Sequence, residues 1–304
     1  MFGLNFMKTP AGLEHMAGAP SSAGVIRRAR HIALLRSGRR HGPITRLITP
    51  WDIGELTQPF LFLGYFEFAS GWQAHLAVHP QPRVATLTLV LSGTLGYEDA
   101  AGNDRTITAG GFKWTTPGER VRHDRGRATD EPLRALLLWI GLPSAFVSSA
   151  AESRYFAPAE VPEEGPVRVM LGQFGRARSV LAPGAPDINY FHVRLRHGQH
   201  WRYLAPDRHN ITWLAVDRGG VRLREGERVY WEQIALFGDS RGMIELQADG
   251  ETSFVLGSAR RRAHPLVQGI NAAVGAATSA EPENGALPGA RAAAEASFNE
   301  SLRT

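Results

Sequence analysis

Short apolar runs separated by turn residues dominate the chain from Pro59 onward. The runs recur at intervals of roughly ten residues, and they include FLFLGYFEF (60–68), ATLTLVL (85–91) and LRALLLWIGL (133–142). Between them, Gly93 and the AAGND stretch (100–104) supply the residues that hairpin turns require. This pattern predicts an antiparallel all-β sandwich or barrel.

A second series of the same kind begins at Val167. The stretch 214–239 has the same outline as 89–114, an apolar strand followed by a glycine turn, a short strand, a second turn and another strand. Two such copies predict a duplicated β-fold. The expected organisation is a basic arm (1–45), a first domain (46–145), a linker (146–165), a second domain (166–275) and a tail (276–304). Within the tail, residues 286–302 are expected to form a short C-terminal helix.

Charge and composition narrow the function classes. The first 48 residues hold eight basic residues and one acid, so the net charge of +5 belongs to the arm and the folded body is slightly acidic. A basic arm can contact nucleic acid, but no aromatic residues are interleaved with its arginines, which favours a solvated tail or one that packs on its own body.

The chain has no cysteine, so thiolate sites and disulfides are excluded. We find no apolar run of membrane-spanning length and no signal peptide, and we expect a cytoplasmic protein with no membrane partner.

The segment from QPFLFLGYFEF through HPQPRVATLTLVLSGTLGYEDAAGNDRTITAGGFKWTTPGERVRH (79–123) resembles the N-terminal domain of the pirin family, in the cupin superfamily. RALLLWIGLP (134–143) and VRVMLGQFG (167–175) are similar to the strands that leave the first barrel of that family and open the second. The resemblance covers about residues 45 to 275. It implies two cupin barrels packed face to face with one metal, usually iron, in the first barrel. Family members are described as transcriptional cofactors and as quercetin-cleaving dioxygenases.

The family resemblance implies ligands at an H-x-H and an H-x-E pair on two strands, where residues two apart share a face. This chain carries His79, Gln81, His123 and Arg125 at those four positions. Gln81 offers only a weak carbonyl ligand, whereas Arg125 remains protonated and removes the carboxylate that would offset the charge of the ion. We therefore expect no metal cofactor.

Several alternatives stay open at this site. Metal binding could be rescued by Asp124, by His75 on the same strand face as His79, or by Glu98 from the next hairpin. Without metal, two histidines, a glutamine and an arginine form a donor-rich pocket that suits an anion. The plainer interpretation is that Arg125 turns to solvent or pairs with an acid such as Asp124, Asp130 or Glu98, and that the pocket binds nothing.

The leading hypothesis is a non-catalytic or regulatory binding protein. It would use the pocket formed by His79, Gln81, His123, Arg125 and His75, and its partner would be a small anionic or flavonoid-like molecule or another protein. The alternative is a quercetin 2,3-dioxygenase, with iron or another divalent transition metal held by His79 and His123 together with His75, Gln81 or Asp124. A third hypothesis is a nucleic-acid-associated regulator that acts through the basic arm.

The remaining candidate residues have structural interpretations. The second domain has further histidines. We interpret His209 as a structural residue beside a strand, and the others as residues of loops or of a strand face, namely His192, His197 and His200. The tryptophans are expected in barrel cores or pocket walls, namely Trp72, Trp114, Trp201, Trp213 and Trp231.

Overall fold

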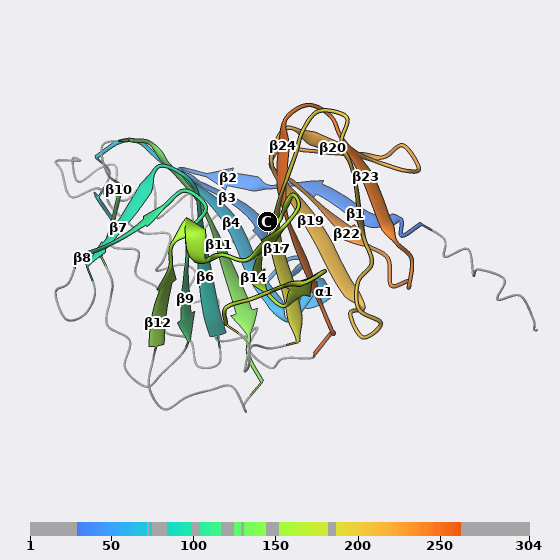
Figure 1. Cartoon of the computed structure of the whole chain (residues 1–304), viewed down its shortest axis with the longest axis horizontal. Helices are drawn as coiled ribbons and strands as arrows, with labels where there is room; N and C mark the ends of the chain where they lie inside the picture. Colours follow the sequence, from blue (N-terminus) through green and yellow to red (C-terminus); the bar gives the residue numbers. More distant parts are fainter. Residues whose placement is uncertain are drawn as a thin grey trace, which may run out of the picture.

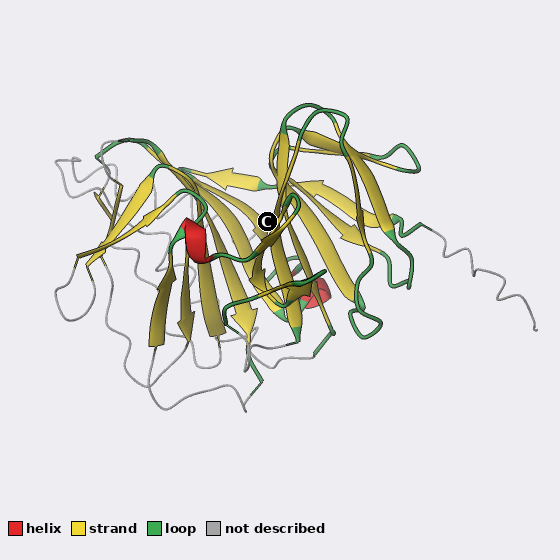
Figure 2. Cartoon of the chain, viewed as in Figure 1, coloured by secondary structure: helices red, strands yellow, loops and turns green. Residues whose placement is uncertain are grey.

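The computed structural model describes residues 29–71, 73–74, 84–98, 104–116, 125–128, 131–143, 152–181 and 187–262. These residues form antiparallel strands and almost no helix, which confirms the all-β prediction (Figures 1 and 2). The helical segments are one α-helical turn and one 3-10 turn, α1 (Gly54–Thr57) and η2 (Pro158–Glu160). The helix predicted over 286–302 lies outside the described residues.

The first barrel is built from two sheets. Its seven-stranded sheet has the order β12 (Glu152–Phe156), β9 (Phe112–Thr116), β6 (Val84–Ser92), β11 (Leu133–Gly141), β4 (Phe60–Phe68), β3 (Ile44–Ile48) and β2 (Arg39–His41). Its four-stranded sheet has the order β5 (Gln73–Ala74), β10 (Arg125–Ala128), β7 (Thr94–Glu98) and β8 (Asp104–Thr108).

The second barrel repeats this arrangement strand for strand. Its seven-stranded sheet has the order β1 (Ile32–Ser37), β22 (Gln233–Phe237), β19 (Ile211–Arg218), β24 (Thr252–Ala259), β17 (Ile188–Leu195), β14 (Val167–Leu171) and β13 (Glu163–Glu164). Its four-stranded sheet has the order β18 (His200–Tyr203), β23 (Ile244–Ala248), β20 (Gly220–Leu223) and β21 (Arg228–Tyr230), and a hairpin joins β15 (Gln173–Phe174) to β16 (Ala177–Arg178). The matching strand orders bear out the duplication that the sequence indicates.

The described part of the basic arm belongs to the folded body. β1 pairs with β22 at the edge of the second barrel, although β2 and β3 join the first barrel. Arg30 is buried against the second barrel, where its guanidinium donates to Gly238 O and to the Thr212 hydroxyl. Arg36 pairs with Asp52 at 2.5 Å. Arg30 and Arg36 therefore bind the protein's own body.

Three apolar clusters hold the structure together. Each barrel has an interior of its own, around Phe62 and Trp139 in the first and around Phe254 and Trp201 in the second. The third cluster lies between the two seven-stranded sheets and contains residues of both barrels. At its centre the rings of Phe60 and Trp213 meet edge to face, with their centroids 5.2 Å apart. Burial of this seam makes the barrels one packing unit.

Candidate functional site

Most of the residues predicted to form the first-barrel site lie outside the described residues, namely His75, His79, Gln81, His123 and Asp124. The backbone of Arg125 is described as the first residue of β10, where it pairs with Glu98 on β7. The cluster of these residues therefore stays a prediction.

The described interior of the first barrel contains a buried lysine. Because Phe112 and Trp114 face the seam between the barrels, the alternation of β9 turns Lys113 to the other face, into the barrel. Its amino group lies 4.4 Å from the ring centroid of Tyr97 and 5.3 Å from that of Tyr155. Both distances are within the range of cation–π attraction, so the two rings stabilise the ammonium form.

Burial dominates the acid–base behaviour of this pair. Lys113 is 6% exposed, and desolvation of the ammonium lowers its pKa to about 8. Burial also raises the pKa of Tyr97, against a smaller opposing effect of a hydrogen bond with Thr88. At neutral pH the barrel interior therefore holds a protonated amine beside a neutral phenol.

Tyr97 links Lys113 to the strand that carries Arg125. In the four-stranded sheet, Tyr97 lies opposite Gly126 of β10, and Gly126 lies opposite Ala74 of β5. Directly opposed residues are about 5 Å apart in such ladders. Lys113 therefore reaches toward β7 and β10 on the sheet face that Tyr97 and Gly126 share, which is not the face of Arg125 and Glu98.

The buried ammonium opposes a divalent cation in this interior, because like charges repel. Among the residues that the structure describes, no group of three or more His, Cys, Asp or Glu side chains is placed to hold a metal ion, and most of the predicted ligand positions lie outside those residues. The ammonium instead attracts negative charge.

A second polar group lies in the second barrel, at the end of the seam between the barrels. His192 and Asp217 are each almost fully buried, with Nε2 of the histidine 3.2 Å from Oδ2 of the aspartate. Ser253 donates a short hydrogen bond to Oδ1 of Asp217, and Arg134 of the first barrel donates to the Asp217 backbone carbonyl at 3.0 Å. Burial alone would raise the pKa of Asp217, but the His192 and Ser253 hydrogen bonds outweigh it and lower the pKa. The Asp217 carboxylate is thus ionised, and both of its oxygens are hydrogen-bonded, one to His192 and one to Ser253.

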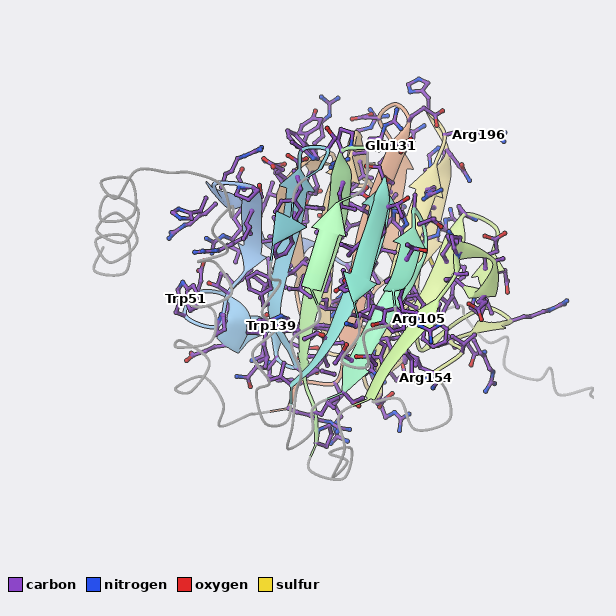
Figure 3. The ribbon with its side chains drawn as sticks, turned by 90° about the vertical axis from the view of Figure 1, so that its left-hand side faces the viewer. Trp51, Arg105, Glu131, Trp139, Arg154 and Arg196 are labelled. Carbon is purple, nitrogen blue, oxygen red and sulfur yellow. The ribbon has the colours of Figure 1, made fainter. Side chains whose placement is uncertain are left out.

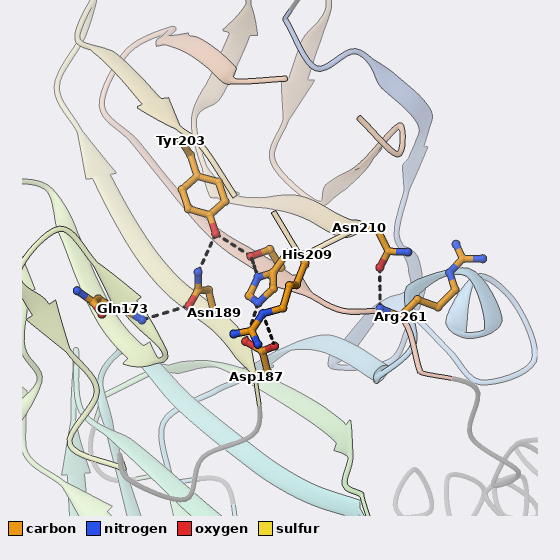
Figure 4. Close-up of polar contacts among 9 residues, drawn as sticks. Gln173, Asp187, Asn189, Tyr203, His209, Asn210 and Arg261 are labelled. Atoms are coloured by element: carbon orange, nitrogen blue, oxygen red, sulfur yellow. Dashed lines mark hydrogen bonds and ion pairs between the residues drawn. The ribbon is translucent and has the colours of Figure 1, made fainter. Parts of the chain in front are cut away.

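A buried chain of polar side chains crosses the second barrel (Figure 4). The His209 ring bridges Asp187 at 3.2 Å and the Ser258 hydroxyl at 2.8 Å, and Ser258 continues to Tyr203 at 2.7 Å. Burial lowers the pKa of His209 despite the neighbouring Asp187 carboxylate. Ser258 is fully buried, so no substrate reaches it. This arrangement satisfies buried polar atoms and agrees with the structural role expected for His209.

Two expectations about other candidate residues need correction. Trp114, Trp201 and Trp213 are buried as predicted, but Trp231 is 43% exposed in the turn before β22. His192 lies on a strand and is buried, whereas His197 and His200 are exposed. The sequence reasoning also missed Lys113, although a lysine between Phe112 and Trp114 in an apolar strand was the available signal.

Comparison with known proteins places this fold. Residues 44–140 match the family model described as Pirin. A Pseudomonas aeruginosa protein provisionally named quercetin 2,3-dioxygenase is 27% identical over 70% of this chain and 79% of its own length. A pirin-like protein of Solanum lycopersicum is 35% identical, and the aligned residues cover 54% of this chain and 56% of that relative.

Solved structures agree on the architecture. A quercetin 2,3-dioxygenase from Acinetobacter baumannii has a TM-score of 0.68 at 19% identity, covering 83% of this chain and 99% of its own. A bacterial pirin from Escherichia coli, in complex with nickel(II), has a TM-score of 0.58 at 20% identity, covering 75% and 99%. These similarities identify the fold. No helix in the described part of the chain is long and apolar enough to span a membrane.

Proposed function

We propose that this chain is a pirin-like bicupin that acts as a non-catalytic binding protein, with a small anionic ligand in its first barrel. The ligand class is a molecule with a phenolate or carboxylate oxygen, such as a flavonoid-like compound. The family fold supplies the barrel, and the residues of this chain supply positive charge inside it.

The buried Lys113 ammonium carries this proposal. Its pKa of about 8 leaves it mostly charged at neutral pH, in an interior where desolvation strengthens electrostatic attraction. An incoming oxyanion would recover part of the solvation that the amine loses on burial. A bound divalent cation would instead add a like charge to the same interior.

The residues at the family's ligand positions support the same conclusion. Gln81 can donate through its amide, and together with His79 and His123 it forms a donor-rich set. We propose that His75, His79, Gln81 and His123 surround the anion together with Lys113. The set contains no carboxylate that would compete with an oxyanion for its hydrogen-bond donors. Arg125 is paired with Glu98, one residue along from Tyr97, and so belongs to the other face of this sheet.

The alternative function is a metal-dependent dioxygenase, favoured by the names of the relatives from Pseudomonas aeruginosa and from Escherichia coli. Metal content and turnover separate the two. Full-length protein purified without chelator is analysed for iron, manganese, nickel and copper, and then mixed with quercetin under air. We expect far less than one metal per chain and no loss of quercetin. Near-stoichiometric metal with turnover would overturn the binding-protein proposal.

Ligand binding is measured by calorimetry at pH 7 with quercetin and with benzoate as probes. Lys113→Met is expected to weaken binding roughly tenfold, because it removes one charge-assisted contact. Lys113→Arg retains the charge and is the matched control. Equal affinities for wild type and Lys113→Met would contradict the role of the amine.

The assignment of the ligand positions has its own test. The double substitution Gln81→His and Arg125→Glu restores three imidazoles and one carboxylate, the set that suits Fe(II). We expect the double variant to bind one equivalent of metal that the parent does not bind. If it takes up no metal, the assignment of these positions is wrong.

A further inference from the structure

An open groove of about 1110 Å³ lies at the mouth of the seam between the two barrels, away from the first-barrel interior. Both barrels line it. Arg134 contributes from the start of β11, and Arg194 and Arg218 contribute from the ends of β17 and β19. Figure 3 shows Arg196, just after β17, at the same end of the molecule as Glu131, just before β11.

The strands that build the seam change from apolar to charged at this mouth. Along β17, Ile188 and Tyr190 pack in the seam, and His192 and Arg194 continue the same face. Along β11, the residues that pack in the seam are Leu136, Leu138 and Ile140, and Arg134 continues their face. The arginines therefore stand where the apolar contact between the barrels ends and solvent enters.

Strand pairing places two of these arginines beside Ser253. Ser253 of β24 lies opposite Arg194 on one side and opposite Arg218 on the other. Arg194 is directly opposed to Ser253 and shares its face, whereas Arg218 follows a register shift after Val216, and both arginines line the groove beside Ser253. Two guanidinium groups in one groove can converge on a single anion.

Three of the four arginines that line the groove lack acidic partners. Arg194, Arg196 and Arg218 form no ion pair with any residue in the described part of the chain, and all three are exposed. After burial, repulsion by Arg194 is the next cause that lowers the pKa of Arg168 on the neighbouring strand. An anion in the groove would relieve this crowding of positive charge.

The acids that line the groove do not cancel its charge. Asp217 is buried and committed to His192 and Ser253, so its carboxylate is already compensated. Glu251 is exposed at the rim and forms no ion pair with any described residue. Arg134 is paired with Glu67 at 3.0 Å, so the net positive charge of the groove comes from Arg194, Arg196 and Arg218.

We propose that this groove is an anion site for a phosphate group, held between Arg194 and Arg218 with Arg134 and Arg196 at its edge. Guanidinium groups match the geometry of phosphate oxygens, and the volume accommodates a phosphorylated small molecule as well as free phosphate. The site is separate from the first-barrel pocket and does not depend on what that pocket binds.

Calorimetry with full-length protein tests this site, with inorganic phosphate, phenyl phosphate and succinate as probes. Saturable phosphate binding is expected, with Arg194→Gln and Arg218→Gln each weakening it roughly tenfold. Arg222→Gln is the matched control, since Arg222 is an exposed strand arginine on the other sheet of the same barrel.

Each outcome decides the matter. Tighter binding of phenyl phosphate than of inorganic phosphate would identify a phosphorylated small molecule as the ligand, and equal affinities would identify free phosphate. Absence of saturable phosphate binding, or unchanged affinity in the Arg194→Gln and Arg218→Gln variants, would overturn the proposal. So would an equal loss in Arg222→Gln, or tighter binding of succinate than of phosphate.

Discussion

Removal of the buried charge at Lys113 should stabilise the protein in a pH-dependent way. The pKa of this amine falls from 10.5 to about 8 on folding because burial desolvates the ammonium. Such a shift corresponds to about 3 kcal/mol of folding free energy at neutral pH, where the amine is charged in both states. Lys113→Met replaces the amine with an apolar side chain of similar length, so the variant should be more stable by up to about 3 kcal/mol at pH 7.

The pH dependence follows from proton binding in the two states. Between pH 8 and 10.5 the unfolded chain binds the Lys113 proton and the folded chain does not, so the free energy of unfolding rises with pH in this window. The contribution of Lys113 between pH 7 and pH 9 is an increase of about 1.3 kcal/mol. Burial raises the pKa values of Tyr65, Tyr97, Tyr190 and Tyr203, so these phenols stay neutral in this range.

Urea unfolding at pH 7 and at pH 9 measures this increase. Wild type should gain stability relative to Lys113→Met as pH rises, and all groups common to the two proteins cancel in the comparison. Lys113→Arg is the control, because a guanidinium stays charged throughout and should show no such gain.

A direct titration is also accessible, since Lys8 and Lys113 are the two lysines of the sequence. With lysine labelled at its ε carbon, NMR should give one resonance that titrates near pH 8 and is absent from Lys113→Met. Parallel stability profiles for wild type and Lys113→Met, with both lysines titrating above pH 10, would refute the reasoning from burial.

Three further predictions concern the seam between the barrels. Trp213→Ala should cost about 3–5 kcal/mol and leave one cooperative urea transition, because the indole is fully buried against Phe60 of the other barrel; two separate transitions would show that the barrels fold independently. Gly257→Ala should cost about 1–3 kcal/mol, since its new Cβ would clash with the Trp213 ring, and Trp213→Leu should recover part of this loss in a double-mutant cycle. Asp217→Asn should cost about 2–3 kcal/mol in urea unfolding at pH 7 because His192 loses its partner. The wild-type contribution of Asp217 is present above its ordinary pKa of 3.8 and should disappear as pH falls through its lowered folded value, a decline that Asp217→Asn should lack.

The seam and the groove show where prediction from sequence stopped. The stretch 85–91 was read as a strand from its apolar composition, and it forms part of β6. Alternation also indicates that Leu87 and Leu89 share a face, but not that this face packs against a second barrel. The alternation also does not indicate that Arg134 and Arg194, which are far apart in the chain, line the same groove. Contacts of this kind depend on how two complete sheets dock.

Edge strands and turns show the same limit of prediction from sequence. The sequence places β1 in a basic arm because the first 48 residues are rich in arginine, yet this strand completes the edge of the second barrel. Trp231 was expected inside because it is aromatic, yet it lies exposed in a turn. Residue type alone does not indicate which side of a turn faces solvent.

The sequence by itself determined the all-β class and the duplication, because strand alternation and turn chemistry are local properties of the chain. Tertiary structure decided that Lys113 is buried and has its pKa lowered, that Asp217 is ionised against His192, and that arginines of both barrels meet at one groove. Desolvation and charge proximity depend on distances between residues that only the folded chain brings together.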